Sequence, residues 1–365
     1  MFKKVIYFLL VLFVAVICYF VVWPVPVDPV SWNAPTSVGY TGKFAPNNRL
    51  KGLQTFGIGN NRGPEDIALD ANGRIYAATH EGRIVRLQPD GSNPENWVET
   101  GGRPLGIDFD NQGNLIAADA FLGLLSISPD GSITILADVA DGVPILYADD
   151  VDVALDGKIY FSDASTRFGA KEYGGTYEAS LLDLMEHSGS GRLLVYDPVS
   201  QKATTLVDGL TFANGVAVSH DQTYVLVNET GKYRVIRYWI AGPKKGQAEP
   251  IIENLPGFPD NISQGLNDRF WIAFVSPRNP LLDKLSDKPF LRKVIQRMPK
   301  FIRPKATPYG HIIAINGEGQ VLEDLQDPEG GYALITGVTE TNEYLYIGSL
   351  IMPVLGRLSK SSVEL

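Results

Sequence analysis

One short stretch of the chain, LPGFPDNIS at Leu255–Ser263, places a carboxylate directly beside a carboxamide. Asp260 and Asn261 follow two prolines and precede an apolar residue, a pattern typical of the start of a strand. Both side chains offer oxygen atoms, the ligands that hard cations prefer. The question is whether other strand starts in the chain carry the same chemistry.

Six similar segments of the chain answer this question, because each begins with a pair of residues at one register. Carboxylates or amides occupy most of the first positions, and glycine alternates with polar residues at the second. Asp and Asn are common in turns, but Glu is not, so turn preference does not explain the set. The first positions are Glu65, Leu105, Asp149, Asn214, Asp260 and Thr336, and the second are Asp66, Gly106, Asp150, Gly215, Asn261 and Gly337.

These residues predict a calcium site. Three carboxylates that converge on one axis repel one another, and each raises the pKa of the others. A Ca²⁺ ion relieves the repulsion, because it binds about six to eight oxygen atoms from carboxylates, amides and water. The absence of His and Cys from the first positions argues against zinc or copper. The predicted ligands are Glu65, Asp149, Asn214, Asp260 and Asn261.

The six segments also predict the fold that brings these residues together. Where no insertion intervenes, the segments recur about every 40–45 residues, which is the period of a propeller blade. Apolar alternation and frequent turn signals indicate strands. We therefore predict an all-β, six-bladed β-propeller over residues 49–365, with the first positions forming a ring at one end of the central channel. The sequence leaves open which strand closes the circle.

Two insertions with helix-like apolar spacing interrupt the period, at residues 170–189 and 277–304. The second combines Leu, Ile, Phe and Met with seven basic residues between positions 284 and 303. Such a segment suits a membrane surface. It equally suits a lid helix that packs on the propeller and leaves its basic face in water.

The N-terminus is a separate element. Residues 5–23 are uncharged and apolar, long enough for a membrane-spanning helix. Lys3 and Lys4 precede them, which predicts a single-pass protein with a cytoplasmic N-terminus and an extracytoplasmic propeller. A cleaved signal peptide is the alternative, although no small-x-small site follows. Residues 1–23 are thus the predicted tip and anchor, and the proline-rich residues 24–48 a stiff spacer.

Composition narrows the choice of partners. The formal net charge is −9 and the pI about 5.1, which argues against nucleic acid as a partner. The single cysteine, Cys18, excludes an intrachain disulfide. We expect a small molecule, together with a membrane contacted by the N-terminal helix and by the basic segment 284–303.

The motifs GPEDIALD, RPLGIDFD, GKIYFSDAS, FANGVAVSHD, RYWIAG and LPGFPDNIS resemble the strictosidine synthase-like and adipocyte plasma membrane-associated protein-like family of six-bladed calcium propellers. Paraoxonases and the gluconolactonase/regucalcin lactonases belong to the wider group. The resemblance implies a channel Ca²⁺ held by Glu65, Asn214, Asp260 and Asn261. Asp149 stands where related lactonases usually have Asn. Asp66 and Asp150 resemble the acids of a second Ca²⁺ site.

The resemblance further implies hydrolysis of esters or lactones. Ca²⁺ would polarise the carbonyl of a hydrophobic substrate, with Asp149 or Glu65 as the catalytic carboxylate that activates water. Leu105 replaces the histidine of paraoxonases, and Thr336 replaces the glutamate of plant strictosidine synthase. The alternatives are a membrane-tethered binding propeller with a structural Ca²⁺, or a strictosidine synthase-like carbon–nitrogen lyase or synthase.

Overall fold

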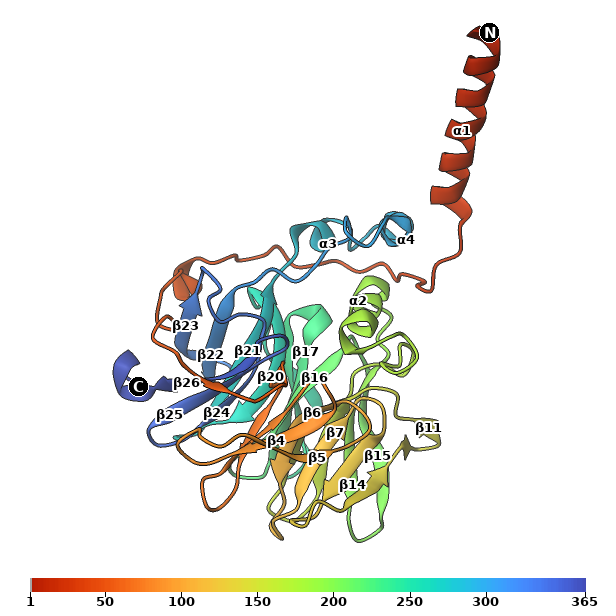
Figure 1. Cartoon of the computed structure of the whole chain (residues 1–365). Coiled ribbons are helices and arrows are strands. Elements are labelled where there is room, and N and C mark those ends of the chain that lie inside the picture. The colour runs from red at the N-terminus through yellow and green to blue at the C-terminus, as the bar shows by residue number, and fades with distance from the viewer. Residues whose placement is uncertain (1) are drawn as a thin grey trace.

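The computed structural model describes residues 2–365 and contains a six-bladed β-propeller, as predicted. Each blade contains four strands that pair antiparallel, and in the first five blades these four strands follow one another in chain order from the central channel outward (Figure 1). Blade one comprises β2 (Ile67–Leu69), β3 (Ile75–Ala78), β4 (Arg83–Leu87) and β5 (Glu95–Glu99); blade two comprises β6 (Pro104–Phe109), β7 (Leu115–Asp119), β8 (Gly123–Ile127) and β9 (Ile133–Ala137). Blade three comprises β12 (Ala148–Val153), β13 (Ile159–Asp163), β14 (Gly191–Asp197) and β15 (Lys202–Leu210), extended by the short β10 (Val139–Ala140) and β11 (Val143–Pro144).

The N-terminal strand completes the last blade and closes the circle. It is β1 (Gln54–Gly57), which pairs with β26 from Gln54 opposite Arg357 to Gly57 opposite Val354. This is the closing strand that the sequence did not identify. Blade four comprises β16 (Ala213–Val218), β17 (Tyr224–Glu229), β18 (Arg234–Trp239) and β19 (Ala248–Ile252); blade five β20 (Gly257–Gln264), β21 (Arg269–Pro277), β22 (Gly310–Asn316) and β23 (Val321–Asp327); blade six β24 (Ile335–Glu340), β25 (Tyr344–Ser349) and β26 (Val354–Ser359) with β1.

The second strand of each blade is buried on both faces, because each sheet packs between two neighbouring sheets. Strands β3 (IYAA), β7 (LIAAD) and β13 (IYFSD) are accordingly buried along their whole length. Their sequences are therefore mostly runs of consecutive apolar residues, and apolar and polar residues do not alternate along them. The hydrophobic core is therefore a series of layers between blades, arranged around the channel.

The inner strands meet in the channel through an alternation of glycine and polar side chains. A Cβ atom on Gly106 would lie 2.3 Å from Oδ1 of Asp150, and one on Gly337 would lie 2.9 Å from Oδ1 of Asp66. A Cβ atom on Gly215 would lie 2.6 Å from Cα of Asn261. Three glycines thus make the space that these three polar residues occupy.

Carboxylates on the inner strands also join neighbouring blades. Asp66 accepts the backbone N–H of Ile107 in the next blade at 2.9 Å, and Asp150 accepts that of Val216 at 2.8 Å. Asp108 and Asp152 make the same kind of contact, with Val153 and Val218. These bonds fix the register between blades at the level of the predicted ring.

A second set of acids, at the ends of β7, β13 and β17, holds the loops that lead into the inner strands. Asp119, Asp163 and Glu229 accept the backbone N–H groups of Arg103, Tyr147 and Thr211, at 2.8, 3.0 and 2.9 Å. Each of those amides lies two or three residues before a ring position. These carboxylates therefore position Leu105, Asp149 and Asn214.

The two predicted insertions form helices over one end of the propeller (Figure 1). The first contains α2 (Thr176–Glu186), and the second contains α3 (Pro280–Lys284) and α4 (Pro289–Arg297). Helix α1 (Phe2–Val22) projects beyond them and is long and apolar enough to cross a membrane. Short 3₁₀ turns lie at Gly42–Phe44, Thr230–Lys232 and Lys360–Val363.

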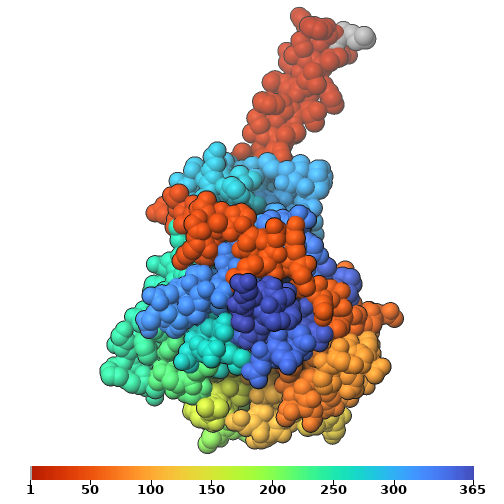
Figure 2. Space-filling model, turned by 90° about the vertical axis from the view of Figure 1, so that its left-hand side faces the viewer, coloured from red at the N-terminus to blue at the C-terminus, as the bar shows by residue number. Residues whose placement is uncertain are grey.

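Residues 24–48, which we call the strap, contain no helix or strand apart from the 3₁₀ turn at Gly42–Phe44, and they pack along the insertions. The backbone N–H groups of Val30 and Trp32 bond to the carbonyls of Glu186 and Ser286, at 2.8 and 3.1 Å. The buried Arg292 of α4 donates to the carbonyls of Val30 and Met185. Figure 2 shows the strap on the surface below the light-blue α3–α4 segment.

The buried ion pair between Asp163 and Arg192 gives the first testable prediction. Their side chains are at most 7% exposed, the closest N–O distance is 2.6 Å, and Asp163 also holds the loop before Asp149. Asp163→Ala leaves Arg192 buried without its partner, which costs about 3–5 kcal/mol of unfolding free energy. Chemical denaturation of the whole chain in detergent measures this.

The matched control is Asp287→Ala, which removes an exposed partner of Lys288. We expect no measurable change in its denaturation midpoint, because exposed pairs contribute little. Equal midpoints for the two variants would contradict the role assigned to Asp163.

Candidate active site

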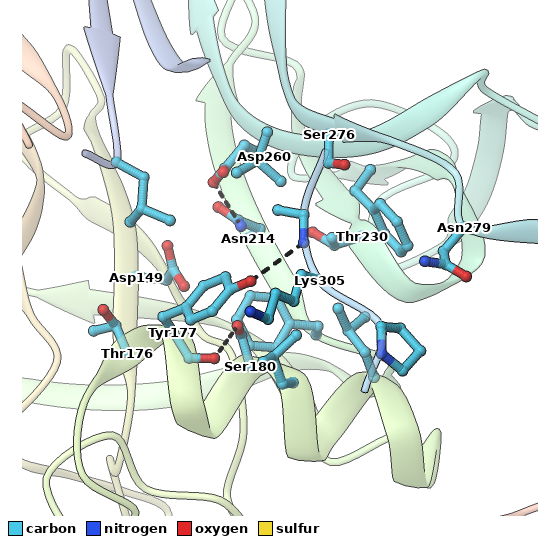
Figure 3. A pocket seen from close by; sticks show the side chains of 18 of the residues that line it. Asp149, Thr176, Tyr177, Ser180, Asn214, Thr230, Asp260, Ser276, Asn279 and Lys305 are labelled. Carbon is cyan, nitrogen blue, oxygen red and sulfur yellow. Dashed lines mark hydrogen bonds between the residues drawn. The ribbon is translucent and has the colours of Figure 1, made fainter. Parts of the chain in front are cut away.

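Four of the predicted ring residues, Glu65, Asp149, Asn214 and Asp260, line one cavity of about 90 Å³. The cavity lies between the end of the channel and a cover made by α2 and residues 304–306. Figure 3 shows Asp149, Asn214 and Asp260 at its base, facing Tyr177 and Ser180 of α2. Its walls are mostly apolar and include Leu105, Tyr147, Leu184, Phe212, Phe258 and Leu282.

The ring residues are connected to one another and to a buried cation. Nδ2 of Asn214 donates to Oδ1 of Asp260 at 2.8 Å. Nη2 of Arg103 lies 3.3 Å from Oε2 of Glu65, and both side chains are 4% exposed. Within residues 2–365 the Asp149 carboxylate accepts no hydrogen bond. Asp149 is therefore the ring acid whose oxygens are not committed to a protein partner.

Side chains behind the ring hold its backbone in place. Asn228 donates to the carbonyl of Asp260 at 2.5 Å, and Thr230 donates to that of Pro259 at 2.7 Å. Thr336, at the sixth ring position, donates to the carbonyl of Glu65 at 2.5 Å and is fully buried. Thr336 thus positions Glu65, a role that needs a hydroxyl donor rather than a base.

The ring carboxylates are held in an environment that disfavours their charge. Burial raises the pKa of Asp149 well above its ordinary value, and the charges of Asp260 and Glu65 raise it further. Burial and Glu65 raise the pKa of Asp260, although the bond from Asn214 opposes this. Burial raises the pKa of Glu65, and Arg103 opposes it. One guanidinium does not balance three carboxylates, so full ionisation requires a further positive charge.

The donor atoms present suit a hard cation such as Ca²⁺. Oδ1 of Asn214 is buried and has no hydrogen-bond partner, and the same holds for Oδ1 and Nδ2 of Asn261. Unpaired buried oxygens beside carboxylates are ligands that Ca²⁺ accepts. No three His, Cys, Asp or Glu side chains form a compact cluster in the described chain, residues 2–365. The ring therefore depends on its amides as well as its acids, and Ca²⁺ stays a prediction.

Asp66 and Asp150, the predicted second metal site, are both buried and lie close enough for the charge of one to act on the other. Burial raises the pKa of Asp66 to about 7, and burial together with Asp66 raises that of Asp150. One oxygen of each already accepts an amide from the next blade. They therefore act as links between blades, and the second Ca²⁺ also stays a prediction.

The sequence reasoning missed Arg103 and the residues of the cover. Arg103 stands two residues before ring position Leu105, and a charged residue inside the run GGRPLGI was the available signal. Tyr177 comes from the first insertion and Lys305 directly follows the second, and both reach the cavity only in three dimensions. His80, His187, His220 and His311 are absent from the cavity lining.

Comparisons with known proteins agree with this architecture. A strictosidine synthase family model matches residues 149–243, and a model for the N-terminal region of strictosidine synthase-like proteins matches residues 42–87. The adipocyte plasma membrane-associated protein of Rattus norvegicus is 34% identical over 367 residues, covering 93% of this chain and 94% of that protein. The chain belongs to the strictosidine synthase-like family. This confirms the family predicted from the motifs.

Further members of the family and more distant propellers extend the comparison. A strictosidine synthase-like protein of Arabidopsis thaliana is 35% identical over 326 residues, covering 80% of this chain and 84% of that one. Among solved structures, a gluconolactonase from Xanthomonas campestris matches with a TM-score of 0.62 at 17% identity, over 84% of this chain and 89% of that chain. Identity at that level shows a shared propeller fold.

The raised carboxyl pKa values of this strictosidine synthase-like protein predict how its stability depends on pH. Asp149, Asp260 and Asp66 bind protons more tightly in the folded than in the unfolded chain. The contribution of these three groups to stability is therefore greatest below the unfolded pKa of about 4 and is lost as pH rises through the folded values. After treatment with a chelator, we expect the melting temperature to fall between about pH 5 and about pH 8.

Added Ca²⁺ should reverse this trend, raising the melting temperature more at the higher pH. Asp149→Asn should raise the melting temperature of chelated protein at the higher pH and shrink the increment from Ca²⁺, since it removes a buried charge that is also a predicted ligand. Differential scanning calorimetry in detergent measures both quantities. If the melting temperature of the chelated protein stays constant or rises over this range, ionisation of the buried ring acids does not destabilise the fold.

Proposed function

We propose that this protein is a calcium-dependent hydrolase of esters or lactones. The observation that carries the proposal is the position of Glu65, Asp149, Asn214 and Asp260 at the base of an apolar-walled cavity. Polar groups converging in such a cavity are typical of small-molecule sites. Glu65, Asp149, Asn214, Asp260 and Asn261 would hold the Ca²⁺, whose contribution when bound is polarisation of a carbonyl group.

The chain's own residues divide the remaining work. Asp149 is the better candidate for the base that takes a proton from water, because its carboxylate accepts no other hydrogen bond in the described chain and its pKa is raised. Glu65 is paired with Arg103, which suits a fixed ligand rather than a proton acceptor. Leu105, Phe212 and Phe258 would bind the apolar part of the substrate.

The geometry supports hydrolysis over the alternatives. Leu105 and Phe258 line the cavity as walls and leave space above the ring, which a purely structural Ca²⁺ would not need. A strictosidine synthase-type reaction needs a base at the sixth ring position, whereas Thr336 there donates a hydrogen bond to the backbone carbonyl of Glu65.

We further propose that α1 remains as a membrane anchor, with its N-terminus in the cytoplasm and the propeller on the other side. Arg297 of α4 donates to the carbonyls of Phe20 and Trp23, at 3.0 and 2.6 Å, and so caps the end of α1. If α1 were a signal peptide, its cleavage would remove these contacts from the folded protein. The name of the rat relative includes plasma membrane association, which agrees with an anchor.

The test is an assay of phenyl acetate and a lactone series with the whole chain in detergent. We expect EDTA to abolish hydrolysis, Ca²⁺ to restore it, and Asp260→Asn to lower kcat/KM by about a hundredfold or more. The matched control is Asp268→Asn, which changes a carboxylate 90% exposed and should leave activity unaltered.

Two results would count against the proposal. Hydrolysis that survives EDTA would remove the metal from the reaction. Binding of Ca²⁺ with no turnover of any ester or lactone would favour a membrane-tethered binding propeller, in which the ring residues serve stability alone.

A further inference from the structure

A second cavity lies next to the candidate active site, on the side where α1 leaves the propeller. It has a volume of about 780 Å³ and lies between the end of α1, helix α2 and residues 296–305. Aromatic and aliphatic side chains dominate its lining, among them Trp23, Tyr173, Leu181, Met185 and Phe301. Its size and apolar character suit a hydrocarbon chain rather than a small polar solute.

The two cavities share one wall. Tyr177, Leu181, Leu184, Leu282, Pro304 and Lys305 line both of them. The wall consists of side chains from α2, of Leu282 from α3 and of residues 304–305. The next residue, Ala306, is joined to α2 where its N–H donates to the Tyr177 hydroxyl at 3.2 Å (Figure 3). A hydrocarbon chain that moved between these side chains would pass from the second cavity to the ring without entering water.

The outer cavity opens where a membrane would lie. Tyr19 and Trp23, at the end of α1, are part of its lining, and Tyr19 donates to the carbonyl of Arg297 at 2.9 Å. Aromatic residues at the end of an apolar helix are typical of the membrane–water interface. The apolar side chains of Phe290, Phe301 and Ile302 are exposed nearby, by 53%, 77% and 55%.

Basic residues surround the same opening. Arg297, Lys300, Arg303 and Lys305 contribute to the lining, and Glu178 is the one acid among the described residues there. Basic side chains beside exposed apolar ones are the composition that binds anionic membrane surfaces. This contrasts with the negative net charge of the whole chain.

We propose that the outer cavity is a passage through which a membrane-dissolved substrate reaches the ring. The substrate class is an ester or lactone carrying one long hydrocarbon chain, which stays in the outer cavity while the carbonyl group reaches Asp149 and Asp260. The inference rests on the proposed hydrolase function for its chemistry. The route itself is a separate claim, which a binding measurement decides.

Leu181→Trp tests the passage, because Leu181 is half-buried in the shared wall and a larger side chain narrows it. Wild type and variant are placed as whole chains in phospholipid nanodiscs with Ca²⁺ and given nitrophenyl palmitate or phenyl acetate. We expect the ratio of palmitate hydrolysis to acetate hydrolysis to fall by about tenfold or more, because the narrowed wall obstructs the long chain more than the acetyl group. Leu155→Trp, at a residue 73% exposed and outside both cavities, should change neither.

A second measurement does not depend on activity. A long-chain alkyl methyl ketone carrying a diazirine on its chain, a non-hydrolysable probe, is photolysed in the same nanodiscs. We expect labelled peptides from residues 173–185 and 296–305, with labelling at 173–185 reduced in Leu181→Trp. The melting temperature of the variant confirms that it folds.

The two claims fail in different ways. Labelling elsewhere, or equal loss of palmitate and acetate hydrolysis in Leu181→Trp, overturns the passage while leaving the hydrolase intact. Labelling at the expected peptides without hydrolysis of either ester overturns the hydrolase, and the passage then stands as a lipid-binding site.

Discussion

The burial of several carboxylates at one end of a narrow channel is the constraint on which the rest of this structure depends. Glu65, Asp149 and Asp260 are each less than 7% exposed, and Arg103 is the cation that the chain itself supplies beside them. An uncompensated buried charge lowers the free energy of unfolding by several kcal/mol, which is a large part of the total stability of a typical domain. The fold must therefore hold these acids rigidly where a partner can neutralise them.

The architecture of the propeller meets this constraint in layers. Glycines at alternate positions, such as Gly106 and Gly337, leave room for Asp150 and Asp66 in the channel. Those acids accept amides from the next blade and fix its position. Outside them, Asp163 and Glu229 hold the loops that carry the ring. Acidic residues thus serve both as candidate ligands and as the links that keep the ligands in register.

The repeat and the ring could be predicted from the sequence because both follow from local patterns. A blade is a run of neighbouring strands, so its period is visible in one dimension, and equivalent positions in different blades must meet at the axis. The partner of β26 could not be found, because β1 is short and about 300 positions away, with nothing but general strand preference to identify it. Arg103 was missed for a related reason, since its pairing with Glu65 joins two blades.

The strap shows most clearly what local patterns leave out. Its prolines and lack of periodicity predict an extended spacer but give no information about its contacts. In the structure its carbonyls accept hydrogen bonds from Arg278 and Arg292, side chains of an insertion more than 200 residues away. Arg297 in turn bonds to the end of α1. The composition of the basic segment suggests a face exposed to water. In the structure its most buried arginines instead donate hydrogen bonds to backbone carbonyls, and one guanidinium can bind several such acceptors at once. Burial of those cations is unfavourable, and the hydrogen bonds to the strap offset the loss of hydration only while the strap stays in place. It follows that α1, the strap and the cover of the cavity behave as one unit, and that the orientation of α1 also sets how the cavity faces whatever surface α1 enters.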